Sequence, residues 1–154
     1  MLKLSLFLHV VAAIFWVGGM LFLSLVVVPF LNVLKDPKEK SAVYRAIGPK
    51  FRTLSWIAII ILCVTGPVNL YLLGIPLSQI FDPAFIATPF GKALIIKIAL
   101  VCLIVISSLL HDFWVGPKAR NSPKYSTYAK VFGRGNLIVA LIIVIFAVII
   151  RAGG

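Results

Sequence analysis

The sequence has few charged residues and very few acidic ones. Only 12% of its 154 residues are charged, about half the usual share of a soluble domain, and only 4 are Asp or Glu. In contrast, 62% of the residues are hydrophobic. A soluble protein of this composition would have too little polar surface to present to water. Soluble enzymes and disordered basic tails are therefore excluded.

Residues that form disulfides or bind soft metal ions are also scarce. The chain has 2 cysteines and 2 methionines, one of which is Met1. Cys63 and Cys102 both lie within apolar stretches, where a thiol is usually a small apolar filler, so no disulfide framework is predicted. The sequence has no Ser/His/Asp set, no phosphate-binding loop and no paired carboxylates in its apolar stretches. No motif therefore supports hydrolysis or group transfer.

The most prominent feature that is present is a set of long apolar runs. Four segments reach or nearly reach the roughly 20 residues that a helix needs to cross the hydrocarbon of a bilayer. They cover about residues 4–34, 53–73, 93–115 and 136–150. We therefore predict an all-α integral membrane protein, in which residues 1–154 form a single four-helix transmembrane bundle. The first run is too long for a signal peptide, and no small-residue cleavage site follows it.

The excess of positive charge predicts the orientation of the spans. The net charge is +11, and the connections 35–52 and 116–135 carry six and five cations, whereas the connection 74–92 carries one cation and one acid. Short loops rich in Lys and Arg stay on the cytoplasmic side. Both termini are then extracytoplasmic, in a prokaryotic-type inner membrane. Since topology explains most of the charge, the lipid bilayer is the predicted partner and nucleic acid is not.

The two cationic connections are predicted to contain short interfacial helices. Asp36-Pro37 has the composition of a helix start, with Asp36 as the cap and proline at the first helical position. This helix is predicted to end at Gly48-Pro49. A second helix is predicted over residues 123–132, with a break at Gly133-Arg134-Gly135 before the last span. The proline-rich middle connection is predicted to form a compact cap.

Ionisable side chains within a span are costly and are functional candidates by default. His9 lies in the outer half of the first span, and Trp16 and Met20 follow it at i+7 and i+11, so the three share one helix face to within about 20°. Lys97 lies in the outer half of the third span and Asn69 near the outer end of the second. His9, Asn69 and Lys97 form a predicted outer polar layer, and Trp16 and Met20 are further candidates for binding a cofactor beside His9.

An inner layer is predicted at the opposite ends of the spans. His111 and Asp112 lie near the inner end of the third span, and Arg52 marks that of the second. At 1.5 Å per residue, His9 and His111 differ in depth by about 24 Å, so one haem or one metal ion in a protomer cannot use both. His111 and Asp112 are interpreted either as a structural cap or as a proton or quinone site.

At these residues the sequence resembles the copper-resistance protein D (CopD) family and, more distantly, the HemJ-type protoporphyrinogen oxidases. The resemblance extends over the first three spans, and its motifs are fairly specific only in combination. They are His9 with Trp16-Val17-Gly18-Gly19, Arg52 with Trp56, Thr65-Gly66 with Asn69, Lys97, and His111-Asp112-Phe113-Trp114-Val115-Gly116-Pro117.

The two resemblances imply different functions. CopD-type proteins are associated with copper uptake or resistance. HemJ-type proteins are four-span proteins that bind haem b, and a first-span histidine and a third-span lysine are important to them. His9 and Lys97 are the positions that would inherit those roles. The longer HemJ pattern is not found, so that enzyme activity is not assigned.

Three functional interpretations remain open. In the first, the protein is a membrane cytochrome or oxidoreductase that binds haem b through His9, with Lys97 as a propionate partner or a neutral amine ligand and with quinone as a redox partner. The second axial ligand would then be His9 of a second protomer in a homodimer. In the second interpretation, the protein transports copper through Met20, Cys63 and Cys102, although Cys102 lies about 140° from the face of Lys97. In the third, it is a scaffold or accessory subunit.

Overall fold

The computed structural model describes residues 1–119 and 122–153, and every secondary-structure element in them is helical. Four helices are long and apolar enough to cross a membrane: Leu2–Val33, Pro37–Leu72, Pro89–Ala119 and Lys124–Arg151. These helices confirm the predicted all-α, multi-pass membrane fold. Arg120, one of the five cations predicted in the third connection, lies outside the described residues.

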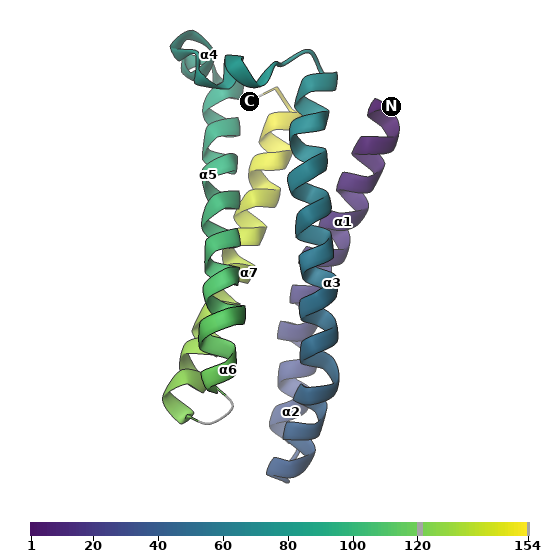
Figure 1. The fold of residues 1–154 in the computed structure, drawn as a ribbon, viewed down its shortest axis with the longest axis vertical. Helices are drawn as coiled ribbons and strands as arrows, with labels where there is room; N and C mark the ends of the chain where they lie inside the picture. The colour runs from purple at the N-terminus through teal and green to yellow at the C-terminus, as the bar shows by residue number, and fades with distance from the viewer. Residues whose placement is uncertain (120–121, 154) are drawn as a thin grey trace. The chain divides into compact units, whose positions relative to one another are not determined.

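The chain divides into two compact units, Met1–Leu73 and Gly74–Gly154. In the first unit, α1 (Leu2–Phe22) continues through a π-helical turn, η1 (Leu23–Val27), into α2 (Val28–Val33). The chain then reverses and returns along α1 as α3 (Pro37–Leu72), as Figure 1 shows. The predicted start of α3 is confirmed, because the Asp36 carboxylate accepts a hydrogen bond from the Lys38 backbone N–H at 2.8 Å.

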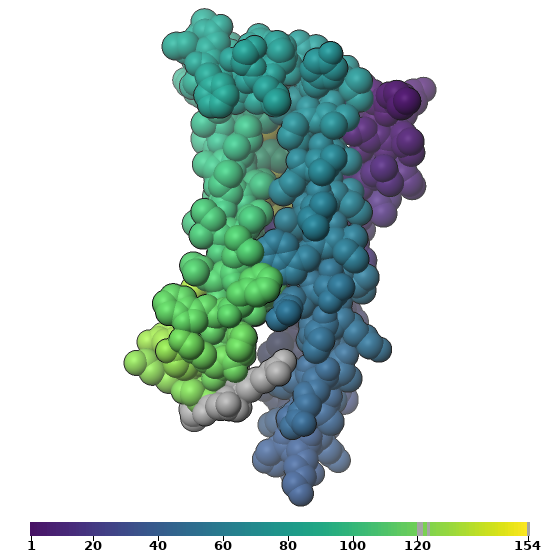
Figure 2. All heavy atoms as spheres, in the orientation of Figure 1, coloured from purple at the N-terminus to yellow at the C-terminus, as the bar shows by residue number. Residues whose placement is uncertain are grey.

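The predicted end of this helix at Gly48-Pro49 is wrong. Residues 37–72 form one uninterrupted helix (Figure 1), and it contains both Pro49 and Pro67. Figure 2 shows the atoms of this segment, coloured blue, as one continuous column. A proline within a helix removes one backbone hydrogen bond, but ending the helix would leave several backbone groups unpaired. Because the continuous helix gives up only one hydrogen bond at Pro49, continuing the helix costs less than ending it there.

The two helices of the first unit pack along an antiparallel seam, which we call the α1–α3 seam. Ala12 and Trp16 on α1 and Ser55 and Ala58 on α3 are buried, with the three- and four-residue spacing of a helix–helix contact. A Cβ added at Gly19 would lie 2.5 Å from Cε2 of Phe51. Gly19 therefore allows the Phe51 ring to pack against α1.

The second unit begins with short helices that follow the end of α3. Gly74 has a φ of 84° at the turn after α3, and η2 (Leu77–Phe81) and α4 (Pro83–Ala87) come next. Asp82 caps α4 by accepting a hydrogen bond from the Ala84 N–H. The middle connection thus contains two short helices, and its role as an extracytoplasmic cap stays a prediction.

Two long helices form the core of the second unit. The first is α5 (Pro89–Leu110), which continues through a π-helical turn, η3 (His111–Val115), into α6 (Gly116–Ala119), and the second is α7 (Pro123–Arg151). Ile104 on α5 and Ala140 on α7 are 0% and 1% exposed, so the centre of this α5–α7 seam is closely packed.

The predicted break at Gly133-Arg134-Gly135 is also wrong, because α7 passes through these residues without interruption. A glycine in a helix costs about 1 kcal/mol relative to alanine. This cost is smaller than that of leaving several backbone groups unpaired, so two closely spaced glycines do not end the helix.

Candidate functional site

His9 lies on the α1–α3 seam and is hydrogen-bonded to the opposite helix. Its Nδ1 atom is 2.7 Å from Oγ1 of Thr65, and that hydroxyl donates to the Ile61 carbonyl oxygen at 2.6 Å. A hydroxyl has a single proton, so Thr65 must accept the hydrogen bond from His9. The Nδ1 atom of His9 is therefore protonated, and in the neutral ring the lone pair lies on Nε2.

This arrangement is the one that metal-binding histidines use. A ligating imidazole usually donates its other N–H to a protein acceptor, which fixes both the tautomer and the ring orientation. Gly66 adjoins the His9 ring, since a Cβ added there would lie 3.8 Å from Cε1 of His9. The Thr65-Gly66 pair thus supplies both the acceptor and the space beside the ring.

Two further polar side chains lie one helical turn from this pair. Ser5 precedes His9 by four residues and Asn69 follows Thr65 by four, so in an antiparallel pair they lie at the same level of the seam. Among the described residues, Ser5 Oγ and Asn69 Oδ1 are buried and have no hydrogen-bond partner. Asn69 is only 7% exposed. Buried unsatisfied oxygens are rare in folded proteins and require a donor such as a water molecule or a ligand.

The other predicted cofactor-binding residues are divided between the two units. Trp16 is 7% exposed and packs in the α1–α3 seam two helical turns beyond His9, while Met20 is half-buried on the same helix. Packing between the two helices accounts for the position of Trp16. Lys97 is half-buried on α5 of the second unit, and its sharing of a site with His9 stays a prediction.

The second unit, to which Lys97 belongs, has two carboxylates in its sequence. Asp82 caps α4 shortly before α5 begins, and Asp112 is fifteen residues beyond Lys97 along α5 and η3, which corresponds to about 22 Å. A lysine in such surroundings is costly, so the position is consistent with a role in binding.

The predicted inner layer is brought together in part. His111 Nδ1 lies 2.8 Å from the Asp112 carboxylate, within the π-helical turn η3. The imidazole also lies beside the Phe132 ring of α7, with 6.5 Å between ring centroids. Arg52 is exposed on α3 of the first unit, and its place in this layer remains a prediction.

Sequence reasoning missed the contacts that Thr65, Ser5 and Asn136 make, although Thr65 was named as part of the Thr65-Gly66 motif. Asn136 is buried on α7, accepts from Ser107 Oγ at 2.6 Å and donates to Ser108 Oγ at 3.3 Å. An amide at the start of an apolar span was the available signal for Asn136. The roles of Thr65 and Ser5 depend on the register between α1 and α3, for which their residue types give no signal.

Comparison with known proteins identifies the family. Residues 45–152 match the family model of copper resistance protein D (CopD). The chain belongs to the CopD family. It is also 41% identical over 154 residues to an "Uncharacterized protein" of Aquifex aeolicus (strain VF5), covering 99% of this chain and 97% of the relative. No solved structure matches the chain.

The family match concerns some candidate residues and not others. It includes Asn69, Lys97, His111 and Asp112, whereas His9 precedes the matched range. The CopD-family match therefore does not itself extend to the histidine of the α1–α3 seam. In the part of the chain that the structure describes, no group of three or more His, Cys, Asp or Glu side chains is arranged to hold a metal ion.

Proposed function

We propose that this CopD-family protein binds haem b through His9 and takes part in electron transfer or another membrane redox reaction. The observation that carries the proposal is the hydrogen bond from His9 Nδ1 to Thr65, whose own proton is directed to Ile61. In the neutral ring this chain of hydrogen bonds places the lone pair on Nε2, the atom through which the imidazole would bind a metal.

Haem fits the available donors better than a bare metal ion does. A porphyrin supplies four nitrogen ligands itself, so the protein has to provide only one or two axial groups. A copper ion held by protein alone needs several side chains together, and the described residues contain no cluster of three His, Cys, Asp or Glu. When bound, haem would supply a one-electron redox centre. His9 would orient it, and Lys97 would pair with a propionate or ligate as a neutral amine.

The proposal includes the organisation of the whole membrane domain. The four spans would form one bundle with both termini outside, in a prokaryotic-type inner membrane, and His9 of a second protomer would help to hold the haem. Cationic residues concentrated in two connections support this orientation. A dimer about an axis along the membrane normal would bring the two His9 residues to equal depth, as shared ligation requires.

Copper transport is the second candidate function, favoured by the description of the matched family. The soft side chains expected to serve it are Met20, Cys63 and Cys102. In the first unit, the register set by His9 and Thr65 places Met20 and Cys63 at levels about nine residues, or roughly 13 Å, apart. This separation favours haem over a copper site shared by these two side chains. The third candidate, a scaffold or accessory subunit, has no specific contact in its favour.

A visible spectrum of the protein purified in detergent tests these candidates. Haem predicts a Soret band that shifts on reduction with dithionite and disappears in His9→Ala. A protein that stays colourless after haem is added would rule out the first proposal. Copper content after loading with Cu(I), compared between the native chain and a Met20→Leu/Cys63→Ser variant, tests the second.

A further inference from the structure

The end of α5 presents a second group of ionisable and aromatic side chains. The Asp112 carboxylate accepts a hydrogen bond from His111 Nδ1 at 2.8 Å, and the Phe132 ring of α7 lies beside the imidazole. All three residues belong to the second unit. A histidine–carboxylate pair within a membrane helix is costly and marks a functional site by default.

The carboxylate determines how His111 presents itself to a ligand. An ionised carboxylate can only accept hydrogen bonds, so Nδ1 of His111 donates and the ring is held in one orientation. The other nitrogen, Nε2, then donates when the ring is protonated and accepts when it is neutral. The side chains of His111 and Asp112 keep 30% and 17% of their surface exposed, so a ligand can reach them.

The backbone at this point departs from a regular α-helix. His111–Val115 forms a π-helical turn, and such turns occur frequently at functional sites. Gly116 closes the turn, since a Cβ added there would lie only 3.1 Å from the His111 carbonyl oxygen. The π-helical turn, which replaces regular α-helix at this point, and Gly116 thus determine how His111 and Asp112 are placed where η3 contacts α7.

A second polar cluster, whose hydrogen bonds join α5 to α7, lies about one helical turn before His111 on α5. Ser107 donates to Asn136 Oδ1, and Asn136 donates to Ser108 Oγ. Because these hydrogen bonds connect α5 to α7, they hold the two helices in register at this level. The packing that positions Phe132 against His111 is therefore fixed independently of any ligand.

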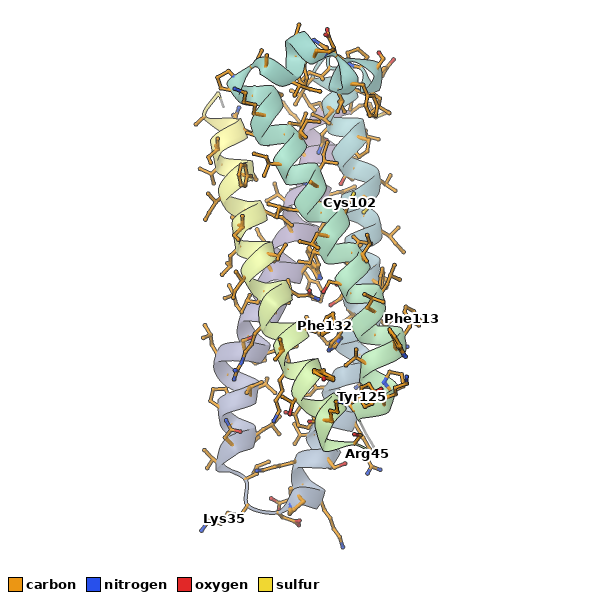
Figure 3. All side chains as sticks on the ribbon, turned by 90° about the vertical axis from the view of Figure 1, so that its left-hand side faces the viewer. Lys35, Arg45, Cys102, Phe113, Tyr125 and Phe132 are labelled. Carbon is orange, nitrogen blue, oxygen red and sulfur yellow. The ribbon has the colours of Figure 1, made fainter. Side chains whose placement is uncertain are left out.

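The surroundings indicate a ligand that arrives through the lipid. Phe113 and Trp114, in the same π-helical turn, are 64% and 59% exposed, and Figure 3 shows Phe113 on the side of α5 away from α7. Large exposed aromatic side chains at the end of a span lie in the interfacial region of a bilayer. A ligand suited to this position has an apolar body and a polar group that hydrogen-bonds to imidazole.

We propose that His111, Asp112 and Phe132 bind the head group of a lipid-soluble quinone. The imidazole Nε2–H donates to a quinone carbonyl, or the neutral imidazole accepts from a hydroquinone hydroxyl, and Phe132 contacts the ring face or edge. Asp112 orients the imidazole. Quinone binding at this site does not depend on the proposed haem. Only its role, which is to supply the redox partner of the haem, rests on the proposed function.

Photoaffinity labelling of the full chain tests this site. The protein is placed in nanodiscs of phosphatidylcholine without quinone, labelled with an azidoquinone and digested. Labelling is expected in the peptide that contains residues 107–118 and is expected to be displaced by decylubiquinone. His111→Ala should weaken the competing affinity by about tenfold, the effect of one hydrogen bond to an ionisable group. Asp82→Asn is the matched control. It keeps a side chain that can cap α4, lies far from His111 in the sequence, and should bind the quinone as the native chain does.

A second variant covers the case in which His111→Ala does not fold. Phe132→Leu retains apolar volume but removes the ring, and it should weaken binding several-fold through lost aromatic contact. Equal labelling in folded variants and the native chain would overturn the proposal. Displacement by phosphatidylglycerol but not by decylubiquinone would also overturn it and would identify a phospholipid site. A colourless protein that still binds quinone at His111 would refute the haem proposal and leave this site standing.

Discussion

The Thr65 hydroxyl accepts a hydrogen bond from His9, fifty-six positions earlier in the chain, at 2.7 Å. This contact joins the two long helical segments of the first unit at the level where a histidine enters an apolar seam. It also determines which imidazole nitrogen is protonated. The proposed ligand chemistry of His9 therefore depends on a residue that is not itself a ligand.

Thr65→Val should disturb this site while conserving side-chain shape. The substitution removes the acceptor and leaves the His9 Nδ1–H without its partner, which costs about 1–3 kcal/mol for a buried donor. We expect a lower melting temperature in detergent and, if haem is bound, a weaker and shifted Soret band. Thr65→Ser retains the hydroxyl and should remain close to the native protein. Equal stability of the valine and native chains would contradict the role of this hydrogen bond.

Nuclear magnetic resonance can read the tautomer directly, because the chain contains only 2 histidines. In protein labelled with 15N-histidine, His9 should appear as the Nδ1-protonated tautomer, and His9→Ala assigns its signals. Thr65→Val should produce a mixture of tautomers at His9 without changing the signals of His111. An Nε2-protonated His9 in the metal-free native chain would show that Thr65 does not accept the hydrogen bond.

Neighbouring glycines provide a matched test of the α1–α3 seam. Gly19→Leu forces a side chain against the Phe51 ring and should destabilise the protein by about 1–3 kcal/mol, the usual cost of overpacking. A Cβ added at Gly18 meets no atom within 4 Å, so Gly18→Leu should be tolerated. Thermal unfolding of both variants in the same detergent measures the difference. Phe51→Ala combined with Gly19→Leu should recover part of the loss, and no recovery would place the clash elsewhere.

The polar contact between α5 and α7 should be cooperative. Ser107→Ala and Asn136→Ala each remove one side of the 2.6 Å hydrogen bond, so the double variant should lose less stability than the two single losses together. Coupling energies of interhelical hydrogen bonds in membrane proteins average about 0.6 kcal/mol. A double-mutant cycle of unfolding free energies in detergent measures this value. Strictly additive losses would mean that the two side chains do not interact in the folded protein.

The sequence was sufficient to predict the number and type of the spans, because apolar runs of this length have few alternatives in a folded protein. The start of α3 was also predictable, since Asp36 and Pro37 act through local hydrogen bonding and backbone geometry. The sequence did not predict that α3 continues through Pro49 or that α7 continues through Gly133 to Gly135. Residue propensities measured in water overstate helix breaking where backbone groups have few other partners.

The sequence predicted which ionisable residues belong to the candidate site, but it did not predict the contacts that they make. His9 and His111 were identifiable because ionisable groups in apolar runs are rare. Their positions along the first and third spans are enough to assign them to two different layers. The partner of His9 depends on how α1 and α3 pack, and many registers satisfy the same apolar pattern. The role of Thr65 as this partner therefore became visible only through the helix pairing.

The continuity of α3 has a mechanical consequence. Its 36 residues extend over about 54 Å, whereas the hydrocarbon of a bilayer is about 30 Å thick. Roughly 24 Å of the helix, somewhat under half of its length, must therefore project beyond the hydrocarbon or lie in the headgroups. Its first turns, near Lys38, belong to the same hydrogen-bonded helix as Thr65 and Asn69. A displacement of those turns at the membrane surface is therefore expected to reach the partner of His9 through the helix itself, and the internal prolines Pro49 and Pro67 are the positions at which the helix bends most easily.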